Sequence, residues 1–220
     1  MRFASGLGVI VITFFALLAS QAPGQESIGP WIATVKILRD GQQTGSGVYL
    51  QSGLIITAAH LTDVSAKMSV HIAGAELAAT VLKQGSIEDV DLSLLSIDEQ
   101  KLPARPVLPK MQLCEAPPWP GDPVIVVDER AATRSHIISP QVLPFSLRSK
   151  FPTLIGDVAT TGLSGSGVFN PDRKCLLGIM SQKITARTLK GDIDLAKYFV
   201  PAAAIRDFMP ADLRGPGYRR

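Results

Sequence analysis

Residues 162–169 read Gly-Leu-Ser-Gly-Ser-Gly-Val-Phe, and no other stretch of the chain constrains the fold as strongly. Three glycines around two serines predict a sharp turn whose backbone N–H groups can point at one place. Converging donors of this kind stabilise a tetrahedral oxyanion by roughly 3–4 kcal/mol each. The same composition is also common in ordinary hairpin turns, so the stretch alone leaves both interpretations open.

Two further motifs lie upstream of this turn. The tetrapeptide Thr-Ala-Ala-His ends at His60, directly after the apolar segment 54–57, and a strand end of this kind suits a general base. The run Asp-Leu-Ser-Leu-Leu begins at Asp91, where a carboxylate can orient an imidazole. Taken singly, each motif favours a structural histidine or a turn carboxylate. In combination they give the order His, Asp, Ser at intervals of 31 and 73 residues.

This combination resembles the trypsin-like serine proteases, in which His, Asp and Ser follow in that order. Within that family the chain is similar to the small bacterial and high-temperature-requirement-like members. The similarity extends from about Trp31 to Met209 and includes Gly-Ser-Gly-Val at 45–48, Pro-Gly-Asp at 120–122 and Leu-Gly-Ile at 177–179. It implies an all-β fold with two packed six-stranded antiparallel β-barrels, as in chymotrypsin, and a short C-terminal helix.

The resemblance also implies a role for each matching residue. Ser164 corresponds to the nucleophile, His60 to the base that takes its proton, and Asp91 to the residue that fixes the histidine tautomer. The N–H groups of Gly162 and Ser164 correspond to the oxyanion hole. The family motif Gly-x-Ser-Gly selects Ser164 rather than the neighbouring Ser166. No metal and no cofactor are implied.

The sequence departs from trypsin at the specificity pocket. Six residues before the nucleophile stands Val158, which has no carboxylate and favours a small or apolar substrate side chain. One wall is expected from Ser181, Gln182 and Lys183. An inward Lys183 would narrow the pocket or pair with an acidic substrate group, but burial of an unpaired lysine is costly, so exposure is expected. Leu163 replaces the aspartate of trypsins, so no zymogen cleavage of their kind is expected.

The rest of the chain agrees with a two-barrel protein. Six short apolar segments lie within a first barrel at about 31–100, and six more lie within a second at about 122–200. A proline-rich linker, 101–121, separates them, because closely spaced prolines exclude strand and helix interiors. One helix is expected at 201–209, within a protease domain of 25–213, and a flexible tail at 214–220.

The N-terminal residues 1–24 are typical of a secretory signal peptide. Arg2 precedes an apolar run from Gly6 to Leu18, about 13 residues long and therefore short for a membrane span. An uncleaved anchor is the alternative. The mature protein is expected to be exported, to the periplasm or outside the cell, with no membrane contact after cleavage. Such a compartment favours a Cys114–Cys175 disulfide over two free thiols, and closing that loop adds roughly 3–4 kcal/mol.

Composition narrows the function classes. Hydrophobic residues make up 46% of the chain and charged residues 19%, which excludes a disordered protein. A net charge of +3 with scattered basic residues argues against nucleic-acid partners. The leading interpretation is a secreted, monomeric serine endopeptidase that acts on proteins or peptides. The alternatives are a catalytically impaired binding protein with the same fold and an esterase. Only 11 residues follow Met209, so the peptide-binding domains of high-temperature-requirement proteases are expected to be absent.

Overall fold

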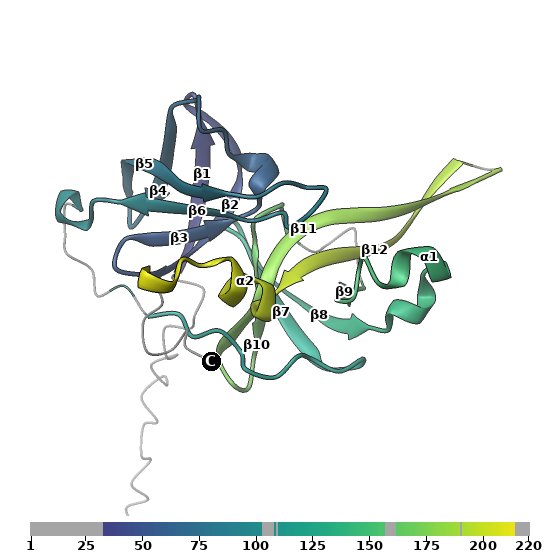
Figure 1. Ribbon diagram of the computed structural model, residues 1–220. Coiled ribbons are helices and arrows are strands. Elements are labelled where there is room, and N and C mark those ends of the chain that lie inside the picture. Colours follow the sequence, from purple (N-terminus) through teal and green to yellow (C-terminus); the bar gives the residue numbers. More distant parts are fainter. Residues whose placement is uncertain (1–32, 103–107, 109, 157–161, 190, 214–220) are drawn as a thin grey trace, which may run out of the picture.

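The computed structural model describes residues 33–102, 108, 110–156, 162–189 and 191–213. Within them, twelve strands form two closed antiparallel barrels of six strands each, in the orders β1-β2-β3-β6-β5-β4 and β10-β11-β12-β9-β8-β7. Figure 1 shows the barrels side by side, with the short C-terminal helix α2 where they meet. The predicted all-β, chymotrypsin-like fold is confirmed. The predicted signal peptide, the tail 214–220 and Val158 lie outside the described residues.

The first barrel is built largely from tight hairpins. Its strands are β1 (Thr34–Arg39), β2 (Gln42–Gln51), β3 (Leu54–Thr57), β4 (Met68–Ile72), β5 (Ala75–Gln84) and β6 (Ser93–Ile97). Two-residue turns at Asp40-Gly41, Ser52-Gly53 and Ala73-Gly74 have positive φ at both positions. Such turns match the natural twist of a hairpin, which is why a glycine lies in each of the three. They fix the β1–β2, β2–β3 and β4–β5 hairpins, and β3 also pairs with β6, so the strands next to His60 and Asp91 are neighbours.

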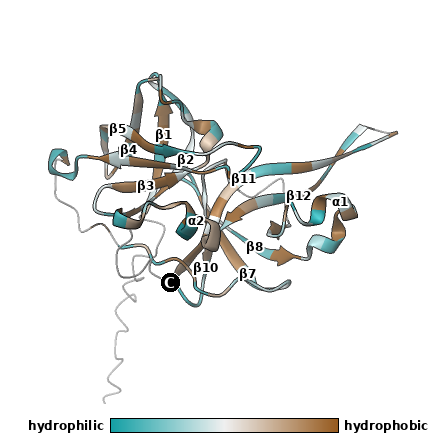
Figure 2. Ribbon diagram, in the orientation of Figure 1, coloured by the Kyte–Doolittle hydropathy of each residue, from teal (hydrophilic) through white to brown (hydrophobic). Residues whose placement is uncertain are grey.

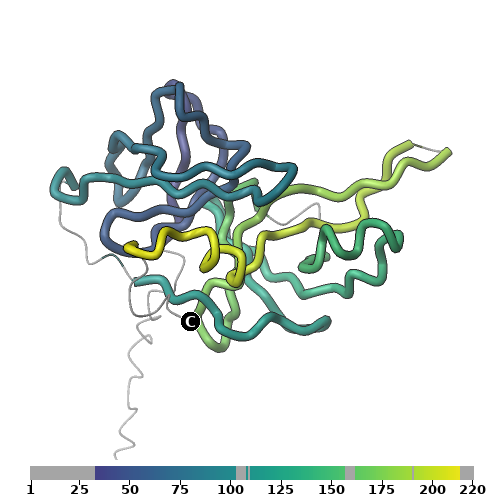
Figure 3. The backbone as a smooth tube through the Cα atoms, viewed as in Figure 1, coloured from purple at the N-terminus to yellow at the C-terminus, as the bar shows by residue number. Residues whose placement is uncertain are grey.

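The second barrel carries a long projecting hairpin. Its strands are β7 (Pro123–Val127), β8 (Ala132–Ile138), β9 (Leu154–Ile155), β10 (Gly167–Asn170), β11 (Cys175–Thr188) and β12 (Gly191–Pro201). Figure 3 shows β11 and β12 extending together away from the body of the molecule. The sequence predicted only 176–181 and 197–200 as strand here. The outer part of the hairpin has few buried residues, so it lacks the apolar pattern that marks a strand.

Two α-helices are described. Helix α2 (Ala202–Phe208) follows Pro201 and buries Ala202, Ile205 and Phe208, which confirms the predicted C-terminal helix with slightly shorter bounds. Helix α1 (Phe145–Arg148) was not predicted, and it is a single turn with no buried residue. So short a helix has no hydrophobic periodicity to reveal it. No helix in the described ranges is both long and apolar enough to cross a membrane.

The linker between the barrels is held by both of them. The N–H of Met111 donates to Leu50 in the first barrel, at 2.8 Å, and the N–H of Cys114 donates to Leu176 in the second, at 2.9 Å. Cys114 and Cys175 form the predicted disulfide, with their Cα atoms 5.1 Å apart. Figure 2 shows apolar segments along the strands of both barrels and hydrophilic ones at turns. The disulfide therefore joins the linker covalently to Cys175, at the start of β11. Residues 180–183, further along the same strand, border the candidate site.

Candidate active site

The three residues matched to the triad come from different elements. His60 lies in a 3-10 turn, Ala59–Leu61, that follows β3. Asp91 lies two residues before β6, and Ser164 lies in the turn before β10. The pairing of β3 with β6, Thr57 opposite Ser93, places His60 beside Asp91. Asp89, two residues before Asp91 in the sequence, is exposed and is not part of this contact.

His60 and Asp91 form a tight pair. The Nδ1 atom of His60 lies 2.9 Å from Oδ2 and 3.1 Å from Oδ1 of Asp91. The backbone N–H of His60 also donates to Oδ1, at 3.1 Å. The side chain of Asp91 is 3% exposed and that of His60 30%. The carboxylate thus fixes both the ring and the backbone of the histidine, and among the described residues no hydrogen bond engages its other ring nitrogen.

Ser181 completes the hydrogen bonding of Asp91. Its hydroxyl donates to Oδ2 at 2.6 Å, from strand β11 of the other barrel. Burial alone would raise the pKa of Asp91, but the hydrogen bonds from His60 and Ser181 outweigh it and lower the pKa below its ordinary value. Asp91 is therefore ionised at neutral pH. The sequence predicted Ser181 only as a pocket wall, because nothing local to it indicates that it meets Asp91.

The turn that carries Ser164 is packed against the first barrel. Gly165 has φ +82°, and a Cβ atom there would lie 1.8 Å from the carbonyl oxygen of Ser46. The N–H of Ser46 donates to the carbonyl of Ser164 at 3.0 Å. Ser166 is wholly buried, and its hydroxyl has no hydrogen-bond partner within the described chain. Ser164 is half-buried, so it is the serine of this turn that substrate can reach.

The hydroxyl of Ser164 has a hydrogen-bond partner, whereas its backbone N–H has none among the described residues. Its Oγ donates to the carbonyl of Ser181 at 3.2 Å, and among the described residues no hydrogen bond joins it to His60. The N–H groups of Gly162 and Ser164 donate to no other group in the described ranges, whereas the N–H of Gly165 donates to Met180 at 2.8 Å. Two unengaged donors in one sharp turn are suited to an anionic oxygen.

A pocket of about 260 Å³ opens beside Ser164. Its walls are the turn at 162–164, residues 180–183 of β11, and Lys197 of β12. Lys183 is exposed, as expected, and its Nζ lies 3.0 Å from Oδ1 of Asp194. Lys197 was missed by the sequence analysis. Only the strand register, which pairs Lys183 with Lys197, brings it to this wall.

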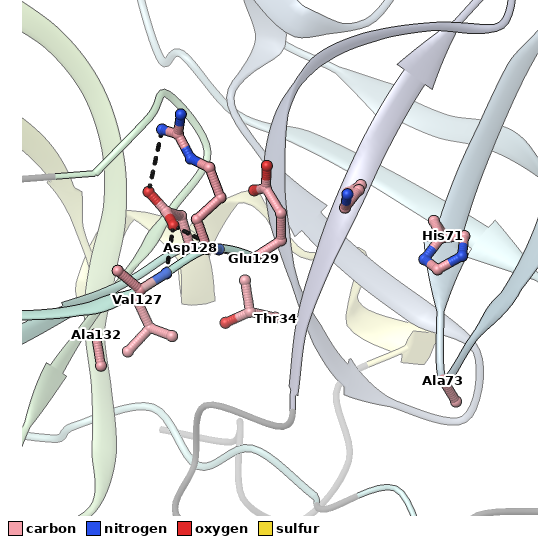
Figure 4. Close-up of a pocket in the computed structure, with 10 residues that line it drawn as sticks. Thr34, His71, Ala73, Val127, Asp128, Glu129 and Ala132 are labelled. Carbon is pink, nitrogen blue, oxygen red and sulfur yellow. Dashed lines mark hydrogen bonds and ion pairs between the residues drawn. The ribbon is translucent and has the colours of Figure 1, made fainter.

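A second cavity, of about 480 Å³, lies between the barrels away from Ser164 (Figure 4). Glu129, after β7, reaches across to the first barrel, where its carboxylate accepts hydrogen bonds from Ser46 Oγ at 2.8 Å and from the amide of Gln43. Burial would raise the pKa of Glu129, but these hydrogen bonds lower it below the ordinary value. Because the backbone N–H of Ser46 donates to the carbonyl of Ser164, Glu129 is linked through Ser46 to the turn that carries Ser164.

A family comparison agrees with this geometry. The model of the trypsin-like peptidase domain matches residues 45–179 of the chain. The chain belongs to this family. The matched range contains His60, Asp91 and Ser164, but it ends before Lys183 and Lys197. No match was found among curated protein sequences.

Solved structures with the same fold are distant in sequence. The active form of the Rv3671c protease from M. tuberculosis is 17% identical, with a TM-score of 0.58, over 81% of this chain and 80% of that one. Kallikrein-related peptidase 10 in complex with Zn²⁺ is 18% identical, with a TM-score of 0.59, over 85% and 96%. The MamO protease domain from Magnetospirillum magneticum is 19% identical, with a TM-score of 0.57, over 83% and 98%. At these identities the likeness concerns the fold.

Proposed function

We propose that this trypsin-like peptidase is a secreted serine endopeptidase that hydrolyses peptide bonds through His60, Asp91 and Ser164. The observation that carries the proposal is the contact between His60 Nδ1 and Asp91, at 2.9 Å, beside a glycine-rich turn that presents Ser164. A histidine held in this way has its second ring nitrogen available as a base. The N-terminal signal-like segment and the Cys114–Cys175 disulfide support secretion.

The chemistry proceeds by acyl transfer. The hydroxyl of Ser164 turns from the carbonyl of Ser181 to the free nitrogen of His60, which takes its proton as Oγ attacks the peptide carbonyl. The N–H groups of Gly162 and Ser164 donate to the oxyanion that forms. His60 then gives its proton to the leaving amine, and an acyl-enzyme remains. Water, activated by the same histidine, hydrolyses that ester.

Asp91 assists without changing its protonation state. Its lowered pKa keeps it a carboxylate while His60 becomes a cation, so the charge that develops on the imidazole is paired at once. The hydrogen bond from Ser181 leaves this carboxylate facing His60 rather than solvent.

A second candidate function is a binding protein with impaired catalysis. One observation favours it, namely that the Ser164 hydroxyl donates to Ser181 and not to His60. Hydrogen bonds between catalytic groups are often long or misaligned before substrate binds, so this geometry is also compatible with an active enzyme. An esterase on the same fold would use the same residues, and cleavage of an amide substrate separates it from a peptidase.

The test is hydrolysis of an unstructured protein such as casein, with the products sequenced by mass spectrometry. We expect new internal cleavages with the wild type and with Ser166→Ala, because the Ser166 hydroxyl makes no hydrogen bond to a described residue. Ser164→Ala should reduce turnover by a factor of about 10⁶. A folded wild type that binds casein without cleaving it would favour the binding protein.

A further inference from the structure

Ser46, on β2 of the first barrel, contacts the turn that carries Ser164. Its backbone N–H donates to the carbonyl of Ser164 at 3.0 Å. Its own carbonyl accepts a hydrogen bond from Thr57 Oγ1 at 2.6 Å, and Thr57 ends β3, three residues before His60. Ser46 is wholly buried. The position of Ser46 therefore affects both the strand that leads to the proposed base and the turn that carries the proposed nucleophile.

The hydroxyl of Ser46 is held by a side chain of the second barrel. Its Oγ donates to Oε2 of Glu129 at 2.8 Å, and the amide of Gln43, also on β2, donates to Oε1. Burial would raise the pKa of Glu129, but these hydrogen bonds lower it, so the carboxylate is ionised at neutral pH. A hydrogen bond to an ionised acceptor is about twice as strong as one between neutral groups. The carboxylate therefore holds Ser46 more firmly than a neutral acceptor would.

Glu129 is itself fixed by the turn 128–131 between β7 and β8. The buried carboxylate of Asp128 accepts hydrogen bonds from the N–H groups of the last two residues of this turn, at 2.8 and 3.0 Å (Figure 4). Strand β7, which ends at Val127, pairs with β10, which begins three residues after Ser164. The sheet that carries the nucleophile turn therefore also carries Glu129, and Glu129 connects it to the first barrel.

We propose that Glu129 is a positioning residue for the reaction, acting on the Ser164 turn through Ser46. The inference rests on the proposed endopeptidase function and adds to it a residue outside the triad. With Ser46 held by Glu129, the N–H groups of the turn keep their direction relative to His60 while the Ser164 hydroxyl rotates toward the histidine. Without Glu129, the buried hydroxyl of Ser46 loses its acceptor, which is costly, and Ser46 shifts together with the turn.

The test measures kcat and KM of Glu129→Ala on a peptide substrate, with kcat referred to the number of sites that a fluorophosphonate probe titrates to completion. We expect kcat to fall by about tenfold to a hundredfold, since a displacement of about 1 Å at a reacting group can cost that much. KM should change little. Glu129→Gln keeps the shape of the side chain and a neutral acceptor for Ser46, so it should recover part of the loss. An unchanged kcat per titrated site in folded Glu129→Ala would overturn the inference.

A double-mutant cycle tests the route through Ser46. Ser46→Ala removes the hydroxyl and leaves the backbone N–H that donates to Ser164. It should lower kcat about as much as Glu129→Ala does. Adding Glu129→Ala to Ser46→Ala should then have little further effect, because both variants break the same hydrogen bond. Losses that multiply would mean that Glu129 acts independently of Ser46, and would overturn the proposed route.

The first barrel offers a matched control. Glu76, on β5, accepts a hydrogen bond from Ser69 Oγ on β4 at 2.7 Å, in a hairpin that does not line the pocket beside Ser164. Glu76→Ala therefore breaks a hydrogen bond of the same kind and should leave kcat per titrated site unchanged. A loss equal to that of Glu129→Ala would show a general effect of stability and overturn the positioning role.

The fluorophosphonate probe also separates this inference from the function on which it rests. A wild type that is labelled at Ser164 and active, beside Glu129 variants with an equal kcat, retains the proposed function and loses the positioning role. A folded wild type that is neither labelled nor active overturns both. If Glu129→Ala fails to fold, Glu129→Gln decides alone: a kcat below that of the wild type supports the role, and an equal kcat overturns it.

Discussion

Each of the two barrels contributes one charged side chain near Ser164, Asp91 from the first and Lys197 from the second. The surroundings of these two side chains differ. In the first barrel, the carboxylate of Asp91 is 3% exposed and receives hydrogen bonds from His60 and from Ser181 across the interface. In the second barrel, the ammonium group of Lys197 is half-buried and bonds to the carbonyl of Gly162. The lowered pKa of Asp91 means that its charged form is stabilised. The lowered pKa of Lys197 means that its charged form is destabilised.

This contrast suggests a division of roles. A fully bonded carboxylate is suited to a task that is the same for every substrate, which is the orientation of His60. Lys197 instead lines the pocket beside Ser164, a position suited to contact with the substrate. Changes on the first side should therefore lower the rate for all substrates equally, and changes on the second should alter the choice between them.

After loss of the Ser164 hydroxyl itself, the largest expected effect belongs to Asp91→Asn. An amide at this position favours the wrong tautomer of His60, so kcat should fall by about 10⁴. The loss should be the same for two peptide substrates that differ in the residue before the cleaved bond. Steady-state kinetics on the two substrates measures it. If the loss were confined to one of them, the division between the two sides would fail.

Removal of the disulfide should lower the free energy of unfolding without changing the groups around Ser164. The double variant Cys114→Ser, Cys175→Ser should lose about 3–4 kcal/mol of unfolding free energy, since the closed loop spans about 60 residues. Urea denaturation measures this, with reduced wild type as a matched control. Turnover of a peptide substrate should not change. Alkylation of both cysteines in the native protein without reductant would contradict the structure.

Ser181→Ala tests the hydrogen bond that links the two barrels. It removes one donor to Asp91 and leaves the carbonyl of residue 181 in place, so kcat should fall by about tenfold to a hundredfold. KM should change little. A loss as large as that of Asp91→Asn would mean that Ser181, rather than His60, is the main support of the carboxylate.

The smallest expected effect is a pH dependence of stability. The pKa of Asp91 is lower in the folded protein than the unfolded value of about 3.9, so its ionised form stabilises the fold. This contribution is complete above the unfolded value and is lost as the pH falls through the folded one. The difference in unfolding free energy between wild type and Asp91→Asn should therefore shrink below about pH 4. A difference that grows on acidification would contradict the assigned direction.

The fold could be predicted, and His60, Asp91 and Ser164 could be proposed as a triad, because their signals are local. His60, Asp91 and Ser164 each lie in a short motif, and paired glycine turns mark the hairpins of the first barrel. The disulfide also followed from the sequence, since only two cysteines are present.

The missed features depend on contacts between distant segments. The register of β11 and β12, which shifts after Met180 and again after Ile184, brings Lys197 to the pocket. The hydrogen bond from Ser181 to Asp91 joins residues 90 positions apart. Neither the strand register nor this hydrogen bond produces a recognisable residue pattern within one segment of the sequence. The outer hairpin and helix α1 were missed for a related reason, because they bury too little apolar surface to show periodicity.

The most direct test of the account is the reaction of the purified protein with a fluorophosphonate probe, with the labelled residue mapped by mass spectrometry. We expect a single label on Ser164 in the wild type, and none on folded His60→Ala, because the hydroxyl is reactive only when a base takes its proton. A folded wild type that stays unlabelled, or a label on Ser166 or another residue, would contradict the assignment of Ser164 as the activated nucleophile.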